Sequence, residues 1–307
     1  MTEEAFARAP VIEGDGPVLV FGGPYSNLQA TEAVLSVAAR EGIPPSRVVC
    51  TGDVVAYCGD PVDTIDRVRD AGITVVAGNT DESLGAGSRD CGCGFEEGSV
   101  CSVLARDWYA LADASVRDDQ RAWLAALPAR AVIAIAGRRL GVIHGSIEAT
   151  AGYVFASTPA GEKARQIAAS GLDGLVGGHC GLPFVERVGV PGSGDGLWLN
   201  AGVVGMPAND GTPRAWYAIL TPEGDGAVTV KLRSLAYDHG AAAARMRAEG
   251  MPEPYAETLV TGLWPSLDIL PPPERAATGI ALAHREMRWS GPDGQAPAAP
   301  AALSTPA

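Results

Sequence analysis

The chain has 307 residues, 47% of them hydrophobic, and is therefore long enough to bury a sizeable core in one domain. Its formal net charge of −13, from 36 acidic and 23 basic residues, repels a phosphate backbone and excludes the usual charge pattern of a nucleic-acid-binding protein. Residues 1–10 carry no apolar run, and no later stretch reaches the roughly 18 apolar residues that a membrane span requires. We expect a cytoplasmic protein without nucleic-acid or membrane partners, of unknown oligomeric state.

Short apolar runs alternate with helical patterns between residues 17 and 77. The first run ends in Gly22-Gly23-Pro24, which is typical of a buried strand entering a loop. Apolar residues then recur at the i, i+3, i+4 and i+7 spacing of a helix. This alternation predicts a layered α/β fold. The expected elements are strands at 17–21, 47–50 and 73–77 and helices at 28–40 and 61–71.

The pattern changes after residue 82. A loop rich in Gly and Cys comes first, followed by a helical region from about 100 to 127 that we expect to cap one end of the sheet. Strand-like runs then dominate, often as hairpins, so a mixed sheet, or two sheets packed face to face with helices outside, fits better than a simple parallel sheet. These runs lie at 131–136, 139–143, 174–177, 196–199, 216–220 and 228–232.

These boundaries predict one domain at residues 17–270, with the helical cap inserted at about 84–128. Residues 1–16 are expected to form an N-terminal extension. From residue 271 the composition turns to Pro and Ala, and residues 291–307 contain almost no large apolar side chain. We therefore expect residues 271–307 to form a partly disordered tail.

Four polar side chains follow predicted strands, at the strand ends where ligands collect in α/β sheets. Each is flanked by Gly, which allows the backbone to turn sharply and bring the four side chains to one point. Their mixture of nitrogen and oxygen ligands suits one divalent ion such as Mn, Fe or Zn. Each residue taken singly is more typical of a turn or a hydrogen-bonded core position, so the argument depends on the set. The four residues are Asp53, Asn79, His144 and His179.

The order of these segments resembles the calcineurin-like metallophosphoesterases of the small bacterial phosphodiesterase branch, over residues 18 to 232. Segments 26–30 and 210–215 resemble further parts of the family. The resemblance implies a four-layered α/β sandwich with mixed sheets flanked by helices. It also implies two metal ions bridged by one Asp and hydrolysis of phosphate esters by a metal-bound hydroxide. The matching segments are Gly52-Asp53, Gly78-Asn79-Thr80-Asp81, His144-Gly145, Gly178-His179 and Asn200-Ala201-Gly202-Val203-Val204-Gly205.

The departures from the family pattern concentrate on one of its two metal sites. Gly23 and Tyr25 replace the Asp and His of the family's first segment, and Gly181 replaces the second His of its last segment. Thr80 replaces the His that assists the leaving group in the family. Of the first site only Asp53 remains, whereas the second keeps all four of its ligands. We therefore expect a single metal ion.

The cysteines offer a candidate replacement for the lost site. Cys91, Cys93 and Cys101 have the spacing C-x-C-x7-C in the loop after Asn79, although this pattern matches no strong zinc module. Cys58 and Cys180 follow segments that carry expected ligands, and the five together form a candidate second metal or redox site. The alternative is that these cysteines pack in the core, form a disulfide in the loop or remain free thiols.

The leading hypothesis is a hydrolase that cleaves a small phosphorylated substrate through a metal-bound water. Asp81 is expected to position a neighbouring group, and Tyr25, Asn27, Thr80 and Arg214 are the candidate substrate contacts. With one metal and no His at position 80, ordinary phosphoesterase activity should be weak. Two alternatives remain: a mononuclear metalloenzyme, for instance with iron, whose non-phosphate chemistry involves the cysteines, and a non-catalytic relative that binds a ligand.

Overall fold

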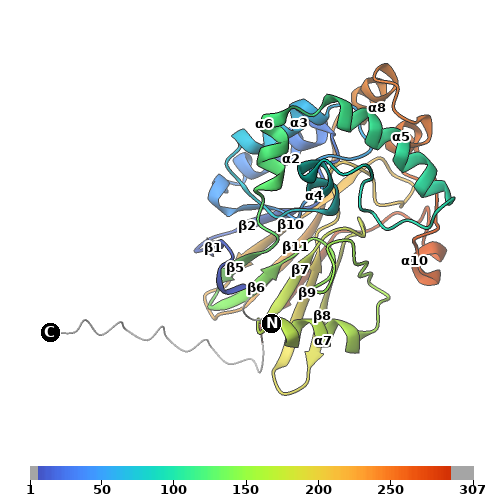
Figure 1. Cartoon of the computed structure of the whole chain (residues 1–307). Helices are drawn as coiled ribbons and strands as arrows, with labels where there is room; N and C mark the ends of the chain where they lie inside the picture. Colours follow the sequence, from blue (N-terminus) through green and yellow to red (C-terminus); the bar gives the residue numbers. More distant parts are fainter. Residues whose placement is uncertain (1–5, 292–307) are drawn as a thin grey trace.

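The computed structural model describes residues 6–291, which form two six-stranded sheets packed face to face with helices outside (Figure 1). Sheet 1 has the strand order β12-β11-β10-β2-β3-β4, and sheet 2 has the order β1-β5-β6-β7-β9-β8. Both sheets are mixed: β2, β3 and β4 run parallel, as do β6, β7 and β9, while hairpin partners run antiparallel.

The strands of sheet 1 are β2 (Val18–Phe21), β3 (Val48–Cys50), β4 (Thr74–Val75), β10 (Ala215–Pro222), β11 (Val228–Leu235) and β12 (Arg285–Trp289). Those of sheet 2 are β1 (Val11–Gly14), β5 (Ala131–Ile135), β6 (Arg138–Val142), β7 (Gly174–Gly177), β8 (Phe184–Val190) and β9 (Gly194–Asn200). The helices are α2 (Leu28–Arg40), α3 (Pro61–Asp70), α4 (Asn79–Ala86), α5 (Val100–Ser115), α6 (Asp118–Ala125), α7 (Ala160–Ser170), α8 (His239–Ala248), α9 (Glu253–Thr261) and α10 (Pro272–Ala276), with a 3-10 turn, η1, at Pro45–Arg47.

The four layers follow from strands that are buried on both faces. In β2, Val18 and Val20 point into the core between the two sheets, whereas Leu19 and Phe21 point into the core beneath the helices. Helices α2, α3, α5, α8 and α9 contribute to that outer core, and α7 covers the far face of sheet 2. The four-layered α/β sandwich expected from the sequence is therefore confirmed.

The structure extends the sheets beyond the predicted limits of 17 and 270. Strand β1 pairs in parallel with β5, and β12 pairs antiparallel with β11, so segments expected to be an extension and a tail supply two edge strands. Trp289 of β12 is fully buried because its ring enters the core between the sheets. Strand β8 and helix α7 are further elements that the sequence patterns did not predict. Residues 292–307 of the predicted tail lie outside the described part of the chain.

The helical region predicted as a cap forms α5 and α6, which contact α3 and join the helical layer over sheet 1 (Figure 1). The helix predicted at 28–40 is observed with the same limits, since Asn27 caps its start by accepting a hydrogen bond from the Ala30 amide. Within residues 6–291, no helix is long and apolar enough to cross a membrane.

Candidate metal centre

The four expected ligands come from both sheets and meet at one edge of the sandwich. Asp53 follows β3 and Asn79 begins α4 after β4, while His144 follows β6 and His179 follows β7. One potential ligand atom from each of Asp53, His144 and His179 lies within 4.8 Å of the others. Strands β3 and β4 belong to sheet 1, whereas β6 and β7 belong to sheet 2. Packing of the two sheets therefore brings these residues together.

Two of these residues have a backbone conformation that is unusual for their type. Asp53 has φ of 58° and His179 has φ of 53°, in the left-handed region that favours glycine. Such strain is characteristic of functional sites, where the surrounding structure holds it in place. Gly78 is required beside Asp53, because a Cβ at residue 78 would lie 2.2 Å from the Asp53 carboxylate.

The nitrogen atoms of the two histidines are arranged as a ligand set. His144 Nδ1 lies 2.6 Å from the carbonyl oxygen of Thr51, which assigns the proton to Nδ1 and leaves the lone pair on Nε2. That Nε2 lies 3.2 Å from Asp53 Oδ2 and 3.2 Å from His179 Nδ1. Three electron-rich atoms therefore converge where a cation would bind.

The electrostatics also favour a positive charge at this point. Burial lowers the pKa of His144, but the adjacent Asp53 carboxylate outweighs burial and raises this pKa above its ordinary value. The pKa of His179 falls to about 3, first because of burial and then because of His144, so this ring is neutral and available as a ligand. The Asn79 Oδ1 atom is buried without a hydrogen-bond partner. The donor set thus fits a divalent transition metal ion.

Asp81 and Thr80 hold the Asp53 loop. The Asp81 carboxylate is fully buried and accepts hydrogen bonds from the amides of Asp53, Val54 and Gly78, at 2.8 to 2.9 Å. The Thr80 hydroxyl donates to Asp53 Oδ1 at 2.9 Å, and the Thr80 amide donates to the same oxygen at 3.1 Å. These bonds leave Asp53 Oδ2 facing the histidines, so Thr80 acts on a candidate ligand and is not a free substrate contact.

Two predicted substrate contacts lie away from this site. Asn27 donates to the Gly205 carbonyl at 3.0 Å in addition to capping α2. The Arg214 guanidinium donates to Asp210 at 3.0 Å and to the Leu282 carbonyl at 3.1 Å, and it stacks over Trp216. Neither residue lines the pocket described below, and both have polar atoms engaged by other groups. Their assignment as substrate contacts stays a prediction.

A pocket opens beside Asp53 and His179, and aromatic side chains form much of its wall. The Tyr153 ring lies 4.3 Å from the His179 ring between centroids, and Tyr57 contacts Tyr25 and Tyr255 edge-on or tilted. Sequence patterns missed most of this wall, because its residues come from segments far apart in the chain. Its aromatic members are Tyr25, Tyr57, Phe95, Tyr153, Tyr255 and Trp264.

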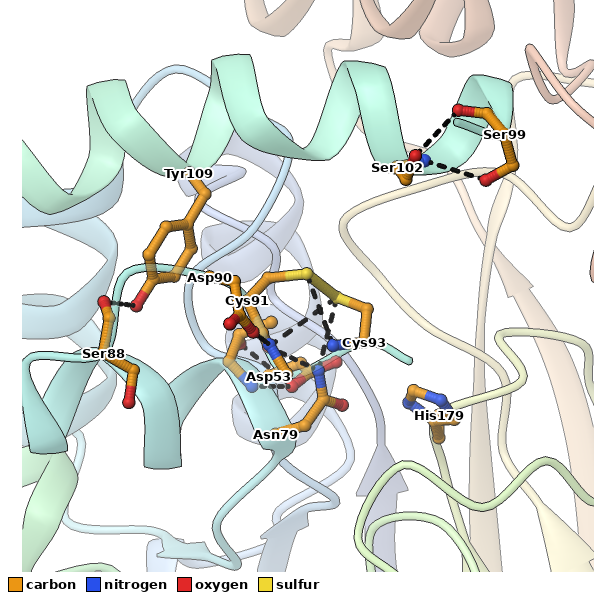
Figure 2. The surroundings of a disulfide bond; sticks show 12 residues. Asp53, Asn79, Ser88, Asp90, Cys91, Cys93, Ser99, Ser102, Tyr109 and His179 are labelled. Carbon is orange, nitrogen blue, oxygen red and sulfur yellow. Dashed lines mark hydrogen bonds between the residues drawn. A yellow bond between two sulfur atoms is a disulfide. The ribbon is translucent and has the colours of Figure 1, made fainter. Parts of the chain in front are cut away.

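Within the described residues, the five cysteines of the candidate second site are not gathered into one cluster. Cys91 and Cys93 form a disulfide beside Asn79 (Figure 2), so neither offers a thiolate. Cys101 and Cys180 line the pocket, and burial raises the pKa of the Cys180 thiol to about 12, which keeps it protonated. The buried Cys58 thiol contacts the Gly205 carbonyl instead of the pocket. In the described chain, the group of His, Cys, Asp and Glu side chains close enough to share an ion is Asp53, His144 and His179.

The disulfide loop contacts a candidate ligand directly. Asn79 Nδ2 donates to the Cys91 carbonyl at 2.9 Å and contacts Cys93 Sγ at 3.4 Å. Figure 2 shows Asn79 and Asp53 beneath the sulfur bridge, with His179 opposite. Because its amide nitrogen is engaged by the loop, the Asn79 oxygen is the atom left for a metal.

Fold and site together define a layered α/β protein with a candidate metal-binding edge between its two sheets. Residues 25–225 match the family described as the calcineurin-like phosphoesterase superfamily domain. This match covers more than half of the chain, and the protein therefore belongs to that superfamily.

Solved structures share this fold. A metallophosphoesterase from Sphaerobacter thermophilus has 26% sequence identity and a TM-score of 0.62, over 80% of this chain and 99% of that one. The hypothetical protein PH1004 from Pyrococcus horikoshii OT3 shares the fold, with 17% identity and a TM-score of 0.64 over 81% of this chain and 99% of that one. The uncharacterized protein MJ0912 of Methanocaldococcus jannaschii is 34% identical over 64 residues, 21% of this chain, and the match spans 26% of that protein.

Proposed function

We propose that this protein hydrolyses a small phosphoester with one divalent transition metal ion, bound by Asp53, Asn79, His144 and His179. The observation that carries the proposal is the convergence of Asp53 Oδ2, His144 Nε2 and His179 Nδ1, with the unpartnered Asn79 Oδ1 nearby. One carboxylate oxygen and two imidazole nitrogens are ligand types that suit a divalent transition metal ion. The family assignment supports ester hydrolysis as the associated chemistry.

Three of the four proposed ligands are held by a neighbour that sets their orientation. Thr51 fixes the proton of His144, Thr80 holds one oxygen of Asp53, and the Cys91 carbonyl holds the amide of Asn79. A bound divalent ion polarises a phosphoryl oxygen and lowers the pKa of water. Orientation by outer contacts keeps the lone pairs directed at one point before an ion arrives.

The residue at the position of the family's leaving-group histidine offers no free proton. Thr80 stands at the position of the family's histidine, and its buried hydroxyl is already donated to Asp53. A leaving alkoxide would therefore receive no proton from this position. We propose that turnover of ordinary alkyl phosphoesters is weak for this reason.

The proposal is tested by metal analysis and by hydrolysis of an activated ester. We expect about one equivalent of metal per chain and manganese-stimulated release of 4-nitrophenol from 4-nitrophenyl esters of phosphate. His179→Ala should lose both metal and activity. His284→Ala, at an exposed histidine hydrogen-bonded to Ser234, is the matched control and should retain both. A chain that binds no metal and hydrolyses none of these esters would contradict the proposal.

The pocket thiols favour a second candidate, a mononuclear iron enzyme with non-phosphate chemistry. Cys101 and Cys180 line the same pocket as His179. An electron paramagnetic resonance signal from iron in the purified protein, perturbed by Cys101→Ser, would favour this candidate. Metal binding without any turnover would instead favour a ligand-binding relative.

A further inference from the structure

A second cavity, here called the disulfide cavity, lies between the disulfide loop and one face of α5, and both Cys91 and Cys93 line it. Its volume is about 690 Å³, within the range of about 300–1,000 Å³ that is typical of ligand sites. Figure 2 shows the sulfur bridge on the side of the loop that faces α5. The disulfide is therefore part of the wall of a cavity with room for a small molecule. The α5 members of this wall recur at the i, i+3, i+4 and i+7 spacing of one helix face and are Ser102, Ala105, Arg106 and Tyr109.

The disulfide cavity is lined by charged side chains of both signs. Arg89 and Arg106 line it together with Asp90 and Glu97, and all four residues are exposed. In the described part of the chain, neither arginine forms an ion pair and the Glu97 side chain has no hydrogen-bond partner. Two guanidinium groups and a carboxylate of this cavity are therefore available to a ligand that carries both signs of charge.

We propose that the disulfide cavity binds a small peptide thiol and that the bound thiol exchanges with the Cys91–Cys93 disulfide. The ligand class is a low-molecular-mass thiol that carries two carboxylates and one ammonium group. Its carboxylates complement Arg89 and Arg106, and its ammonium group complements Glu97. The disulfide is thereby a site of reversible covalent modification.

The burial of the two cysteines favours a small thiol over the thiol of another protein. Cys91 is 6% exposed and Cys93 is 4% exposed. Exchange requires that the attacking sulfur reach one sulfur of the disulfide. A protein must bring its own backbone up to the bond, which the wall formed by α5 obstructs, whereas a small molecule enters the cavity.

The exchange balances without a further oxidant or reductant. The thiolate sulfur of the ligand forms a bond to one sulfur of the disulfide, the Cys91–Cys93 bond breaks, and the other cysteine leaves as a thiolate with the bonding electron pair. A second ligand thiolate then attacks the ligand sulfur of the mixed disulfide and releases the second cysteine. Two ligand thiols are thus oxidised to one disulfide, and the protein disulfide is reduced to two thiols. The protons of the ligand thiols pass through solvent to the cysteine thiolates.

The surroundings of the disulfide favour exchange over a purely structural role. The Cys93 amide lies 3.4 Å from Cys91 Sγ, and Asn79 Nδ2 lies 3.4 Å from Cys93 Sγ, so each sulfur has an N–H group beside it to stabilise a departing thiolate. The two cysteines are only two positions apart, and loop closure stabilises a fold least when the closed loop is short. Because Asn79 is a candidate metal ligand, exchange changes the surroundings of the candidate metal centre.

The test compares two thiols on the purified, oxidised full chain. Reduced glutathione carries two carboxylates and one ammonium group, whereas 2-mercaptoethanol is uncharged. Opening of the disulfide is followed by acid quenching, alkylation and mass spectrometry, and each rate is divided by the thiolate concentration of its thiol. We expect glutathione to react at least about tenfold faster and with saturation, because charge-assisted binding precedes exchange.

The two arginines provide the variant and its internal control. Arg89→Ala combined with Arg106→Ala should reduce the preference for glutathione by about tenfold and leave the rate with 2-mercaptoethanol unchanged. Because both arginines are exposed, we expect this double variant to fold. Arg8→Ala combined with Arg187→Ala removes the same charge from exposed positions outside the lining and should leave both rates unchanged.

A further variant locates the exchange. Cys91→Ser leaves Cys93 as a single thiol, and Cys101→Ser removes the half-buried free thiol of α5. The combined variant should form a mixed disulfide with oxidised glutathione at Cys93, identified by peptide mass spectrometry. Adding Arg89→Ala and Arg106→Ala should slow its formation about tenfold.

Four results would overturn the inference. Equal normalised rates for the two thiols would show that the cavity does not bind glutathione before exchange. A preference that survives removal of both arginines would place the binding site elsewhere, and absence of a mixed disulfide at Cys93 would show that the ligand does not reach this sulfur. Reduction by thioredoxin that is faster than reduction by glutathione would show that a protein thiol reaches the bond. None of these results depends on the proposed hydrolysis.

Discussion

Thr80 is the residue whose role changes most between sequence and structure. At the sequence level it is a missing histidine, whereas in the structure its hydroxyl and amide both hold Asp53 Oδ1. Removing an outer contact of a metal ligand typically reduces metal affinity by about 10- to 100-fold. We therefore expect Thr80→Val to weaken Mn²⁺ binding by a factor in this range, measured by calorimetric titration.

Thr80→Ser provides the matched control, because it keeps the hydroxyl and should bind Mn²⁺ nearly as the wild type does. Equal affinity of the valine variant would show that the backbone amide alone orients Asp53. The candidate ligands themselves were predictable from the sequence, because each follows an apolar run and adjoins glycine. The contact of the Thr80 side chain with Asp53 was not predictable from the sequence, because it depends on the left-handed backbone conformation of Asp53.

The disulfide loop acts at the scale of an element, since it positions the start of α4. Its contacts from Cys91 and Cys93 to the Asn79 amide leave Asn79 Oδ1 as the free atom. We expect the double variant Cys91→Ser, Cys93→Ser, or reduction of the wild type, to lower Mn²⁺ affinity about tenfold. Cys101→Ser, at a cysteine outside the bond, should leave it unchanged. Unaltered Mn²⁺ affinity after verified reduction would show that the loop backbone is sufficient to orient Asn79 without the disulfide.

A charged network joins helices α3 and α6 and gives an acid-sensitive contact. Hydrogen bonds from Arg117 and then Arg69 lower the pKa of Asp119 to about 2 from its ordinary value of 3.8. Because the folded-state pKa is depressed, the stabilisation is complete above the ordinary pKa and is lost as pH falls through about 2.

We expect the Asp119 carboxyl signal to titrate in NMR with a midpoint of about 2. The difference in unfolding free energy between wild type and Asp119→Asn should shrink as pH falls from 5 to 2. Asp107→Asn, at an exposed position on α5, controls for the change in net charge. A difference that does not vary with pH would mean that the network adds no pH-dependent stability.

At the scale of the whole molecule, β12 connects the two sheets. The Trp289 ring is fully buried between them, and its Nε1 donates to the Asp195 carbonyl of sheet 2 at 2.8 Å. Truncation of a buried Trp costs about 3–5 kcal/mol. We expect Trp289→Ala to lower the free energy of unfolding by this amount in urea denaturation. Arg288→Ala loses an exposed ion pair with Asp225 and should cost less than about 1 kcal/mol.

A loss at Trp289 as small as that at Arg288 would mean that β12 is not part of the cooperative fold. The sequence favoured a Pro- and Ala-rich tail here because β12 buries one large side chain in five residues. Strand β1 was not predicted from the sequence for a similar reason, since only two of its four residues are buried. Edge strands this short show little periodicity, and the hydrogen bonds that define them come from partners elsewhere in the chain.

The sequence by itself determined the layered fold, the helix at Leu28–Arg40 and the four candidate ligands, because local spacing of apolar residues, caps and glycines encodes these features. Only the tertiary structure decided the composition of the pocket, the engagement of Thr80 and Arg214, and the pairing of Cys91 with Cys93. The physical reason is that these features depend on contacts between segments whose separation in the chain carries no periodic signal. The candidate metal centre combines both levels: local motifs supply the candidate ligands, and packing of the two sheets brings them together.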